Sequence, residues 1–141
     1  MKVKTIDQTI QINATAEKVW QVLWDKEHYK KWAAAFMAGS HYTGDLQQGS
    51  RIQFLGPDNT GMESNVESIT PNRKITFHHL HELEAGKEGR SLGNMREKYS
   101  LDEQDGITTL SLESDMPEEY FTGMNAATKK ALQTIKELAE A

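Results

Sequence analysis

Three histidines stand close together in the sequence His78-His79-x-His81, and imidazole can act as a metal ligand, a proton carrier or a hydrogen-bonding group. In an extended strand, alternation places His79 and His81 on the same face. Two imidazoles at this spacing could hold a metal ion if Glu63 or Glu97 added a carboxylate. A catalytic zinc site usually has three protein ligands with supporting partners, so we expect no metal. A hydrogen-bonding His79 inside a cavity is one alternative, and satisfied or surface histidines are the simplest interpretation.

Glu97 is the second candidate for acid–base chemistry, because alternation places it on the same strand face as Met95 and Tyr99. A carboxyl group that points inward among such neighbours could donate or accept a proton. The simpler interpretation is a residue at the rim of the sheet that pairs with basic neighbours such as Arg96 or Lys98. Since neither alternative gives a complete catalytic set, we assign no catalytic residue.

A larger set of aromatic, methionine and isolated polar side chains has the character of a binding wall, because flexible methionines and rings with polar groups suit varied ligands. Each apolar member is also explained as plain core, where burial contributes about 1.5–3 kcal/mol per side chain. Core is the simpler interpretation for Trp20 and Phe121, which lie where helix and sheet must meet. Asn125 and Thr128 either direct polar groups into a pocket or only flank it. The candidate cavity residues are Trp24, Trp32, Phe36, Phe54, Met62, Phe77, His79, Glu97, Tyr99, Phe121, Met124, Asn125 and Thr128.

Several other chemistries are excluded by residues or spacings that the chain lacks. It has no cysteine, which rules out disulfides, thiolate metal sites and a cysteine nucleophile. Gly86, Gly89 and Gly93 do not have the spacing of a nucleotide-binding fingerprint. The chain also has no Gly-x-Ser-x-Gly nucleophile elbow. We therefore expect no cofactor, and a protein that binds rather than catalyses.

The bulk composition is that of an ordinary globular chain. Its 141 residues are enough for a substantial core, and we expect a single domain over residues 1–141. With 16 basic and 21 acidic residues, the net charge of −5 argues against nucleic acid or an anionic membrane as the main partner. No apolar run has the form of a signal peptide or a membrane span, so we expect a cytoplasmic protein.

The N-terminal residues predict one strand followed by two short helices. Residues 3–12 alternate between apolar and polar side chains, which indicates a half-buried strand. Thr15 is a suitable N-cap, and the apolar residues of 16–24 then follow a helical period. Asp25 can cap a second short helix that reaches Trp32.

Between residues 38 and 115 the pattern changes to strands and turns. Pro57-Asp58-Asn59, Pro71-Asn72 and Asp105-Gly106 are turn signals, and the last of them predicts a hairpin. Residues 84–93 are polar and contain glycine, so we predict a mobile loop there. The predicted strands are 38–44, 50–56, 61–70, 73–81, 94–102 and 107–114.

The C-terminal residues predict the longest element, a helix of about 23 residues. Asp115 and Glu118 have the spacing of a capping box, with Pro117 in the first turn. Runs of strands beside segregated helices indicate an α+β fold. We therefore predict a curved, seven-stranded antiparallel sheet wrapped around the long C-terminal helix. Since the helix is mixed over 121–128 and aliphatic beyond, any cavity should open near Met124 and the predicted loop.

Short segments spread over the whole chain carry a family resemblance. They are Asn13-Ala14-Thr15-Ala16-Glu17-Lys18-Val19-Trp20, then Trp24-Asp25, His28-Tyr29 and Trp32, and later Gly61-Met62, Pro71-Asn72 and Phe77-His78-His79-Leu80. The first segment resembles the transition from first strand to first helix in the START-like, helix-grip (SRPBCC) superfamily. The next ones are similar to the branch related to the activator of the heat-shock-protein-ninety ATPase. The resemblance implies the helix-grip fold.

The resemblance implies a function less directly, because this superfamily includes lipid carriers, hormone receptors, polyketide cyclases and co-chaperone domains. We predict that the chain binds a small, mostly apolar ligand in a cavity between the sheet and the last helix. A co-chaperone-like interaction domain is the first alternative, and it requires an exposed apolar patch. A cyclase- or hydrolase-type enzyme is the second, and it requires two of His79, Glu97 and Tyr99 to converge. We expect a monomer or homodimer that neither binds nucleic acid nor inserts into a membrane.

Overall fold

The N-terminal elements of the computed structural model, which describes all 141 residues, form as their capping residues predict. Strand β1 (Val3–Ile12) leads to helix α1 (Ala16–Trp24), where the Thr15 hydroxyl accepts a hydrogen bond from the Lys18 amide at 3.2 Å. Asp25 ends α1 and caps α2 (Lys26–Ala33), since its carboxylate accepts from the His28 amide at 3.2 Å. The two helices are thus separate elements that meet at a sharp corner.

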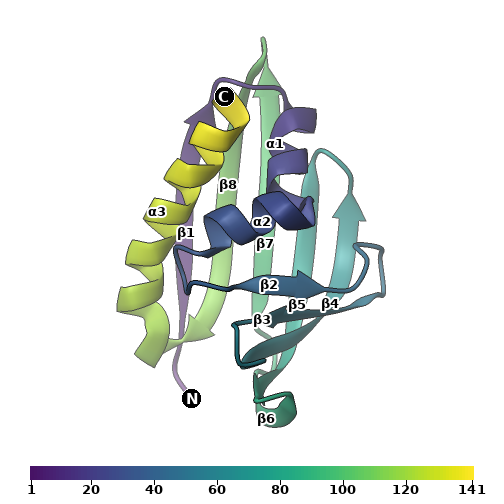
Figure 1. Cartoon of the computed structure of the whole chain (residues 1–141), viewed down its shortest axis with the longest axis vertical. Helices are drawn as coiled ribbons and strands as arrows, with labels where there is room; N and C mark the ends of the chain where they lie inside the picture. Colours follow the sequence, from purple (N-terminus) through teal and green to yellow (C-terminus); the bar gives the residue numbers. More distant parts are fainter.

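The remaining strands complete one antiparallel sheet whose order is β1-β8-β7-β5-β4-β3-β2, with β6 paired to β5 (Figure 1). Gly61, at the start of β4, must be glycine because a Cβ there would lie 1.8 Å from the Phe54 carbonyl oxygen. Asp105 and Gly106 both adopt positive φ in the hairpin between β7 and β8, as the turn signal predicts. The strands after β1 are β2 (His41–Thr43), β3 (Arg51–Leu55), β4 (Gly61–Thr70), β5 (Lys74–Glu84), β6 (Lys87–Ser91), β7 (Arg96–Gln104) and β8 (Ile107–Pro117).

All three α-helices lie on one face of the sheet, and the last of them, α3 (Phe121–Glu140), follows a short 3-10 turn, η1 (Glu118–Tyr120) (Figure 1). Helix α3 runs beside β1 and packs against α1 and α2. Its second half buries Ala131, Leu132, Ile135 and Ala139. The predicted helix-grip arrangement, with the curved sheet around the last helix, is confirmed.

The sheet has eight strands instead of the seven predicted, because residues 84–93 contain a hairpin strand. Ala85 and Gly86, with φ of 50° and 83°, form a two-residue turn that returns the chain along β5 as β6. Strand β6 is mostly exposed and is held by backbone pairing with β5. Its side chains are polar on both faces, so the sequence lacks the apolar–polar alternation that predicts a strand. The prediction of a mobile loop was therefore wrong.

The predicted capping box at the start of the last helix is also absent. Strand β8 continues to Pro117, and the Asp115 carboxylate accepts hydrogen bonds from the Thr5 hydroxyl at 2.7 Å and the Arg96 amide at 3.0 Å. Because this carboxylate is used inside the sheet, α3 begins only at Phe121, without a side-chain cap. Strand β2 is shorter than the predicted strand 38–44, whereas β5 extends three residues beyond the predicted strand 73–81 and β7 begins and ends two residues later than the predicted strand 94–102.

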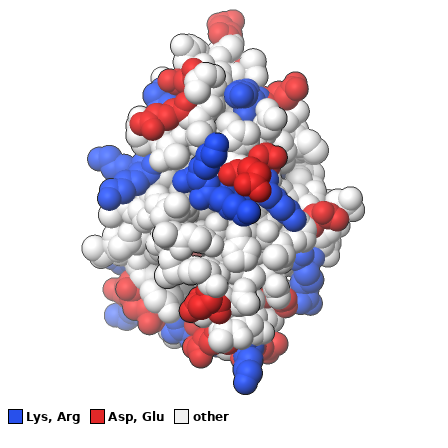
Figure 2. Space-filling model, viewed as in Figure 1, with Lys and Arg blue, Asp and Glu red and all other residues white.

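Charged side chains of both signs are distributed over the face seen in Figure 2. Basic side chains gather over α2, which carries the exposed Lys26, Lys30 and Lys31, and Glu27 lies among them with its carboxylate 3.4 Å from the Lys30 ammonium. None of the helices combines the length and the apolar character needed to cross a membrane.

Candidate ligand-binding cavity

A partly enclosed cavity of about 390 Å³ lies between the sheet and the first half of α3. Its wall comes from α2, from β3, β4, β5, β7 and β8, and from η1 and α3, so both the sheet and the helices contribute. Of its 26 lining residues, 15 are hydrophobic. Its volume is within the range of about 300–1,000 Å³ found for small-molecule sites.

Nine of the thirteen candidate residues line this cavity. Five of them are apolar or aromatic side chains from α2, the turn that follows it, β3, β4 and α3. One is the almost fully buried Thr128, whose hydroxyl donates to the Met124 carbonyl at 2.7 Å. The other three are polar residues of β5 and β7. The nine residues are Trp32, Phe36, Phe54, Met62, His79, Glu97, Tyr99, Met124 and Thr128.

The other four candidates lie outside the cavity wall. Trp24 and Phe77 belong to the packed core, with ring centroids 5.4 Å apart. Phe121 faces β1, where the Lys4 ammonium lies 4.8 Å from its ring centroid. Asn125 accepts hydrogen bonds at its carbonyl and side-chain oxygens from the Gln8 amide group, at 2.9 and 2.8 Å. These side chains fix the position of helix and sheet instead of forming the wall.

Three polar residues of the wall and the buried Ser64 behind them form a continuous hydrogen-bonded chain across three strands. Ser64 Oγ on β4 lies 2.6 Å from His79 Nδ1 on β5, and His79 Nε2 lies 3.2 Å from Glu97 Oε1 on β7. The Tyr99 hydroxyl donates to Glu97 Oε2. Arg96, on the opposite face of β7, pairs instead with Glu67 at 2.8 Å. The interpretation of Glu97 as a rim residue was therefore wrong, because β7 is an interior strand whose inward face bounds the cavity.

The ionisation of the nearby tyrosines follows from their burial and from Glu97. Burial raises the pKa of Tyr99 well above its usual range, and the Glu97 carboxylate raises it further. Burial also raises the pKa of Tyr29, again with a smaller contribution from Glu97. Both phenols stay protonated at neutral pH, so Tyr99 acts as a hydrogen-bond donor. Ser64 is fully buried and absent from the wall, which leaves it unsuited as a nucleophile.

His81 does not share the face of His79, contrary to the alternation in the sequence. The pairing of β4 with β5 shifts between Glu63 and Ser64, and this irregularity adds one residue on β5 between His79 and His81. The imidazole of His81 therefore points away from the cavity, with Nε2 3.4 Å from Glu63. No group of three or more His, Asp or Glu side chains that could hold a metal ion gathers anywhere in the structure.

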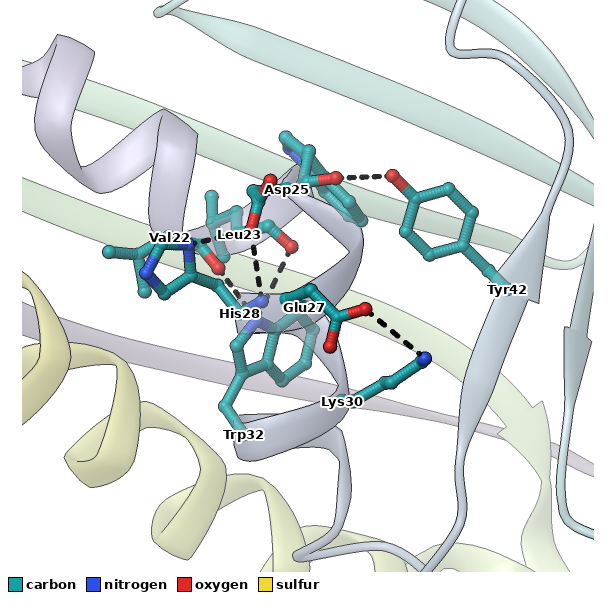
Figure 3. Close-up of polar contacts among 9 residues, drawn as sticks. Val22, Leu23, Asp25, Glu27, His28, Lys30, Trp32 and Tyr42 are labelled. Atoms are coloured by element: carbon teal, nitrogen blue, oxygen red, sulfur yellow. Dashed lines mark hydrogen bonds and ion pairs between the residues drawn. The ribbon is translucent and has the colours of Figure 1, made fainter.

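The corner between α1 and α2 fixes the helical part of the wall (Figure 3). The indole nitrogen of Trp32 donates to the carbonyl oxygens of Val22 at 3.1 Å and Leu23 at 3.3 Å, and the Tyr42 hydroxyl donates to the Trp24 carbonyl. These bonds use backbone acceptors at the end of α1 that have no partner inside the helix. They hold the Trp32 ring against the cavity.

The rim near α3 is held by charged residues from three elements. Arg90 on β6 donates to Glu82 on β5 at 2.9 Å and to Glu119 on η1 at 3.1 Å, and the Tyr120 hydroxyl donates to Glu82 at 3.1 Å. Glu82 and Tyr120 also line the cavity. Strand β6, missed in the sequence, thus links the sheet to the start of the last helix.

A model of one protein family matches residues 13–140 of the chain, under the description "Activator of Hsp90 ATPase homolog 1-like protein". The chain belongs to this family. Its fold is that of the START-like, helix-grip superfamily, as the resemblance of the first helix segment implies. A search of curated proteins found no match to this sequence.

Solved structures of this family's fold resemble the chain over nearly its whole length. A Mesorhizobium loti protein, MLL2253, has a TM-score of 0.74 at 16% identity, with 96% of each chain covered. The Aha1 dimer of Colwellia psychrerythraea gives 0.73 at 18% identity, covering 97% of this chain and 96% of that one. CalU16 of Micromonospora echinospora gives 0.69 at 17%, covering 99% and 77%. At these identities the likeness establishes the fold alone.

Several wall residues of this family member that were not predicted have a signal in the sequence. Leu112, Ser114 and Met116 on β8 alternate and line the cavity, and the period of two in this strand would have identified them. Glu82 and Leu92 have no such signal, because the irregular register of β5 and the unpredicted β6 hairpin bring them to the wall.

Proposed function

We propose that this protein binds a small, mostly apolar molecule in the cavity between the sheet and the first half of α3. The observation that supports this function is the combination of a 390 Å³ space, a largely apolar wall and polar groups that converge at one place. A wall of this type is usual for small-molecule sites, in which a few polar groups orient the ligand.

We propose that ligands enter between α2 and α3, where three side chains form a partition between the cavity and the outer surface. Phe36, Tyr120 and Met124 line both the cavity and a second hollow on the outer surface, next to Gly123 and Ala127. Tyr120 is 44% exposed, and the other two side chains are partly buried. Rotation of these side chains would connect the two spaces without a change in the sheet.

The test is a titration with N-phenyl-1-naphthylamine, a neutral probe whose fluorescence rises in apolar surroundings, combined with thermal unfolding. Saturable binding is expected, and a ligand at ten times its Kd adds roughly 1.4 kcal/mol, a rise in Tm of about 3–6 °C. Ser114→Phe should abolish binding, because it places a ring inside the cavity. Ser111→Phe, on the other face of the same strand, is the matched control and should bind normally.

Equal binding by the Ser114→Phe and Ser111→Phe variants would place the probe elsewhere on the protein and contradict the proposal. Absence of any saturable signal, with the probe and with a panel of apolar compounds, would also contradict it. Far-ultraviolet circular dichroism of both variants checks that the fold is kept.

A second candidate function is catalysis of the cyclase or hydrolase type, which the convergence of His79, Tyr99 and Glu97 favours. Against it, both imidazole nitrogens of His79 and the phenol proton of Tyr99 already have partners within the protein. Of these three residues, only Glu97 has lone pairs left to contact a ligand. Mass spectrometry of bound compounds before and after incubation distinguishes the candidates, since a carrier returns its ligand unchanged.

The co-chaperone alternative requires an exposed apolar patch, and no observation on this chain favours it. Of its exposed large apolar side chains, Val3 on β1 and Ile107 on β8 lie on different strands, while Met37 and Tyr120 border the cavity itself. The Colwellia relative is a dimer, and sedimentation of this protein would test a homodimer directly.

A further inference from the structure

The charged groups on the cavity wall are all acidic, apart from one imidazole. The 26 lining residues include the carboxylates of Glu82, Glu97 and Asp115 and contain no lysine or arginine. An anionic ligand such as a fatty acid would therefore meet like charges and no basic partner. The charge of the wall therefore favours a ligand with a positive charge.

Two of these carboxylates are already engaged by groups outside the cavity. Glu82 is paired with Arg90, with a closest distance of 2.9 Å, and Asp115 accepts from the Thr5 hydroxyl and the Arg96 amide. Both carboxylates are thus held by hydrogen bonds to residues outside the cavity. Glu97 differs, because both of its donors, the His79 imidazole and the Tyr99 phenol, belong to the cavity wall, and no lysine or arginine lies within ion-pair distance of it.

A neutral imidazole satisfies every hydrogen bond of His79. In the neutral form, the Ser64 hydroxyl donates to Nδ1 and the Nε2 proton is donated to Glu97, so each group has its partner. A doubly protonated imidazole would make Ser64 the acceptor and leave its hydroxyl hydrogen without a partner in a fully buried place. Glu97, whose side chain is 16% exposed, then keeps its negative charge without a basic partner. Burial raises the pKa of Tyr29 and of Tyr99, and the Glu97 carboxylate makes a smaller contribution in the same direction.

Aromatic rings line the same cavity as this carboxylate. The rings of Tyr29 and Trp32 lie 4.8 Å apart, and those of Trp32 and Tyr99 lie 6.4 Å apart. Phe54 completes the group, with its centroid 6.3 Å from that of Tyr29. Ring faces attract cations, and a carboxylate among rings is the chemistry that binds ammonium groups.

We propose that the occupant of the cavity is an apolar amine, whose protonated nitrogen binds Glu97 and whose body lies against the aromatic and methionine wall. This inference rests on the proposed binding function and adds the chemical class of the ligand. The buried charge of Glu97 gains its missing counter-ion when the amine binds. A volume of 390 Å³ is within the range of small-molecule sites and is enough for an amine with two or three rings.

The test compares three compounds of one shape, 1-naphthylmethylamine, 1-naphthylmethanol and 1-naphthoic acid, in competition with the neutral fluorescent probe at pH 7. The wild-type protein should bind the amine at least tenfold more tightly than the alcohol, and the acid most weakly. Glu97→Gln should lower the affinity for the amine to that for the alcohol and leave the alcohol within twofold. Glu63→Gln is the matched control, because this carboxylate on β4 lies outside the wall, and it should keep the preference.

The outcomes separate this inference from the binding function on which it rests. Equal affinities for amine and alcohol in the wild-type protein would overturn the amine assignment, while probe binding that Ser114→Phe abolishes would keep the cavity function. An amine preference that survives in Glu97→Gln would likewise overturn the role of Glu97. Failure of the probe and all three compounds to bind would overturn both proposals. The order of affinities for amine, alcohol and acid is measured on the wild-type protein and depends on no variant. Binding of the alcohol by Glu97→Gln shows that the cavity of this variant is intact.

Discussion

The two halves of helix α3 bound regions that are packed in opposite ways. The second half, with Leu132 and Ile135 almost fully buried, packs against α1 and β1 without a cavity of ligand size. The first half, around Met124, instead faces the 390 Å³ space. One straight element thus seals the curved sheet at one end and leaves it open at the other. Core packing and the cavity wall are thus assigned to different ends of the same helix.

The closed region has its own centre, Trp24, beside the corner of α1 and α2. Its ring is stacked on Tyr29 and lies edge-on to Tyr99 and Phe77, with centroid distances of 6.4, 4.9 and 5.4 Å. Tyr99 also lines the cavity, so the packed cluster directly supports the binding wall. This arrangement predicts large losses of stability for changes in the cluster and small ones for changes at the partition.

Trp24→Ala should have the largest effect, a loss of about 3–5 kcal/mol in the free energy of unfolding, because it leaves a void at the centre of the aromatic cluster. Urea denaturation followed by circular dichroism measures it. Trp24→Phe is the matched control and should lose much less, since the Trp24 indole N–H is buried without a hydrogen-bond partner and its removal breaks no bond. Equal losses for the two variants would contradict this account of the cluster.

Ile135→Ala and Met124→Ala compare the two ends of α3 directly. Ile135→Ala should cost about 2–5 kcal/mol, because the side chain is only 1% exposed. Met124→Ala should cost about 1 kcal/mol or less, since its side chain borders an existing space and creates little new cavity. The same urea experiment measures both. If Met124→Ala proved as destabilising as Ile135→Ala, the first half of the helix would be core and not a wall.

The sequence predicts the closed region better than the open one, for a physical reason. Thr15 and Asp25 are caps whose local hydrogen bonds form as their residue types predict. The spacing of apolar residues along one segment is likewise a local signal, and it predicts which face of a helix or strand is buried. The shift in register beside His79 and the turn at Ala85 depend on pairing between strands, and no single segment encodes them.

The candidate site shows the same division between local and non-local signals. Tyr99 and Glu97 were placed together on one face by alternation alone, and both line the cavity. Ser64, which orients His79, has no motif of its own and was missed. The sequence thus predicts some of the wall residues. The contacts that arrange them form between strands and are seen only in the folded sheet.

Raising the pH should destabilise the packed region through its tyrosines. Burial, helped by Asp25 and Asp45, raises the pKa of Tyr42 to about 12, against an ordinary value of about 10 in the unfolded chain. The folded state therefore holds this proton more tightly, and stability is complete below pH 10 and falls as the pH rises toward 12. Each such group adds a slope of up to about 1.4 kcal/mol per pH unit.

Tyr42→Phe isolates this contribution, because lysines titrate in the same range in both proteins. Its unfolding free energy, measured in urea from pH 8 to 11, should start lower through loss of the bond to the Trp24 carbonyl and then fall less steeply than that of the wild type. Parallel slopes for the two proteins would contradict the burial of this phenol.

Ala85→Asn should have the smallest effect, and it changes the hairpin that borders the open region. Ala85 has a φ of 50°, which is strained for alanine, and Asn-Gly is the preferred pair for this type of two-residue turn. The variant should gain about 0.5–1 kcal/mol in unfolding free energy, and Ala85→Val should lose stability because a β-branched side chain tolerates positive φ poorly. Since Arg90 on β6 holds the rim, hydrogen exchange of the β6 amides should slow in Ala85→Asn. Unchanged exchange would mean that the turn does not limit opening of the rim.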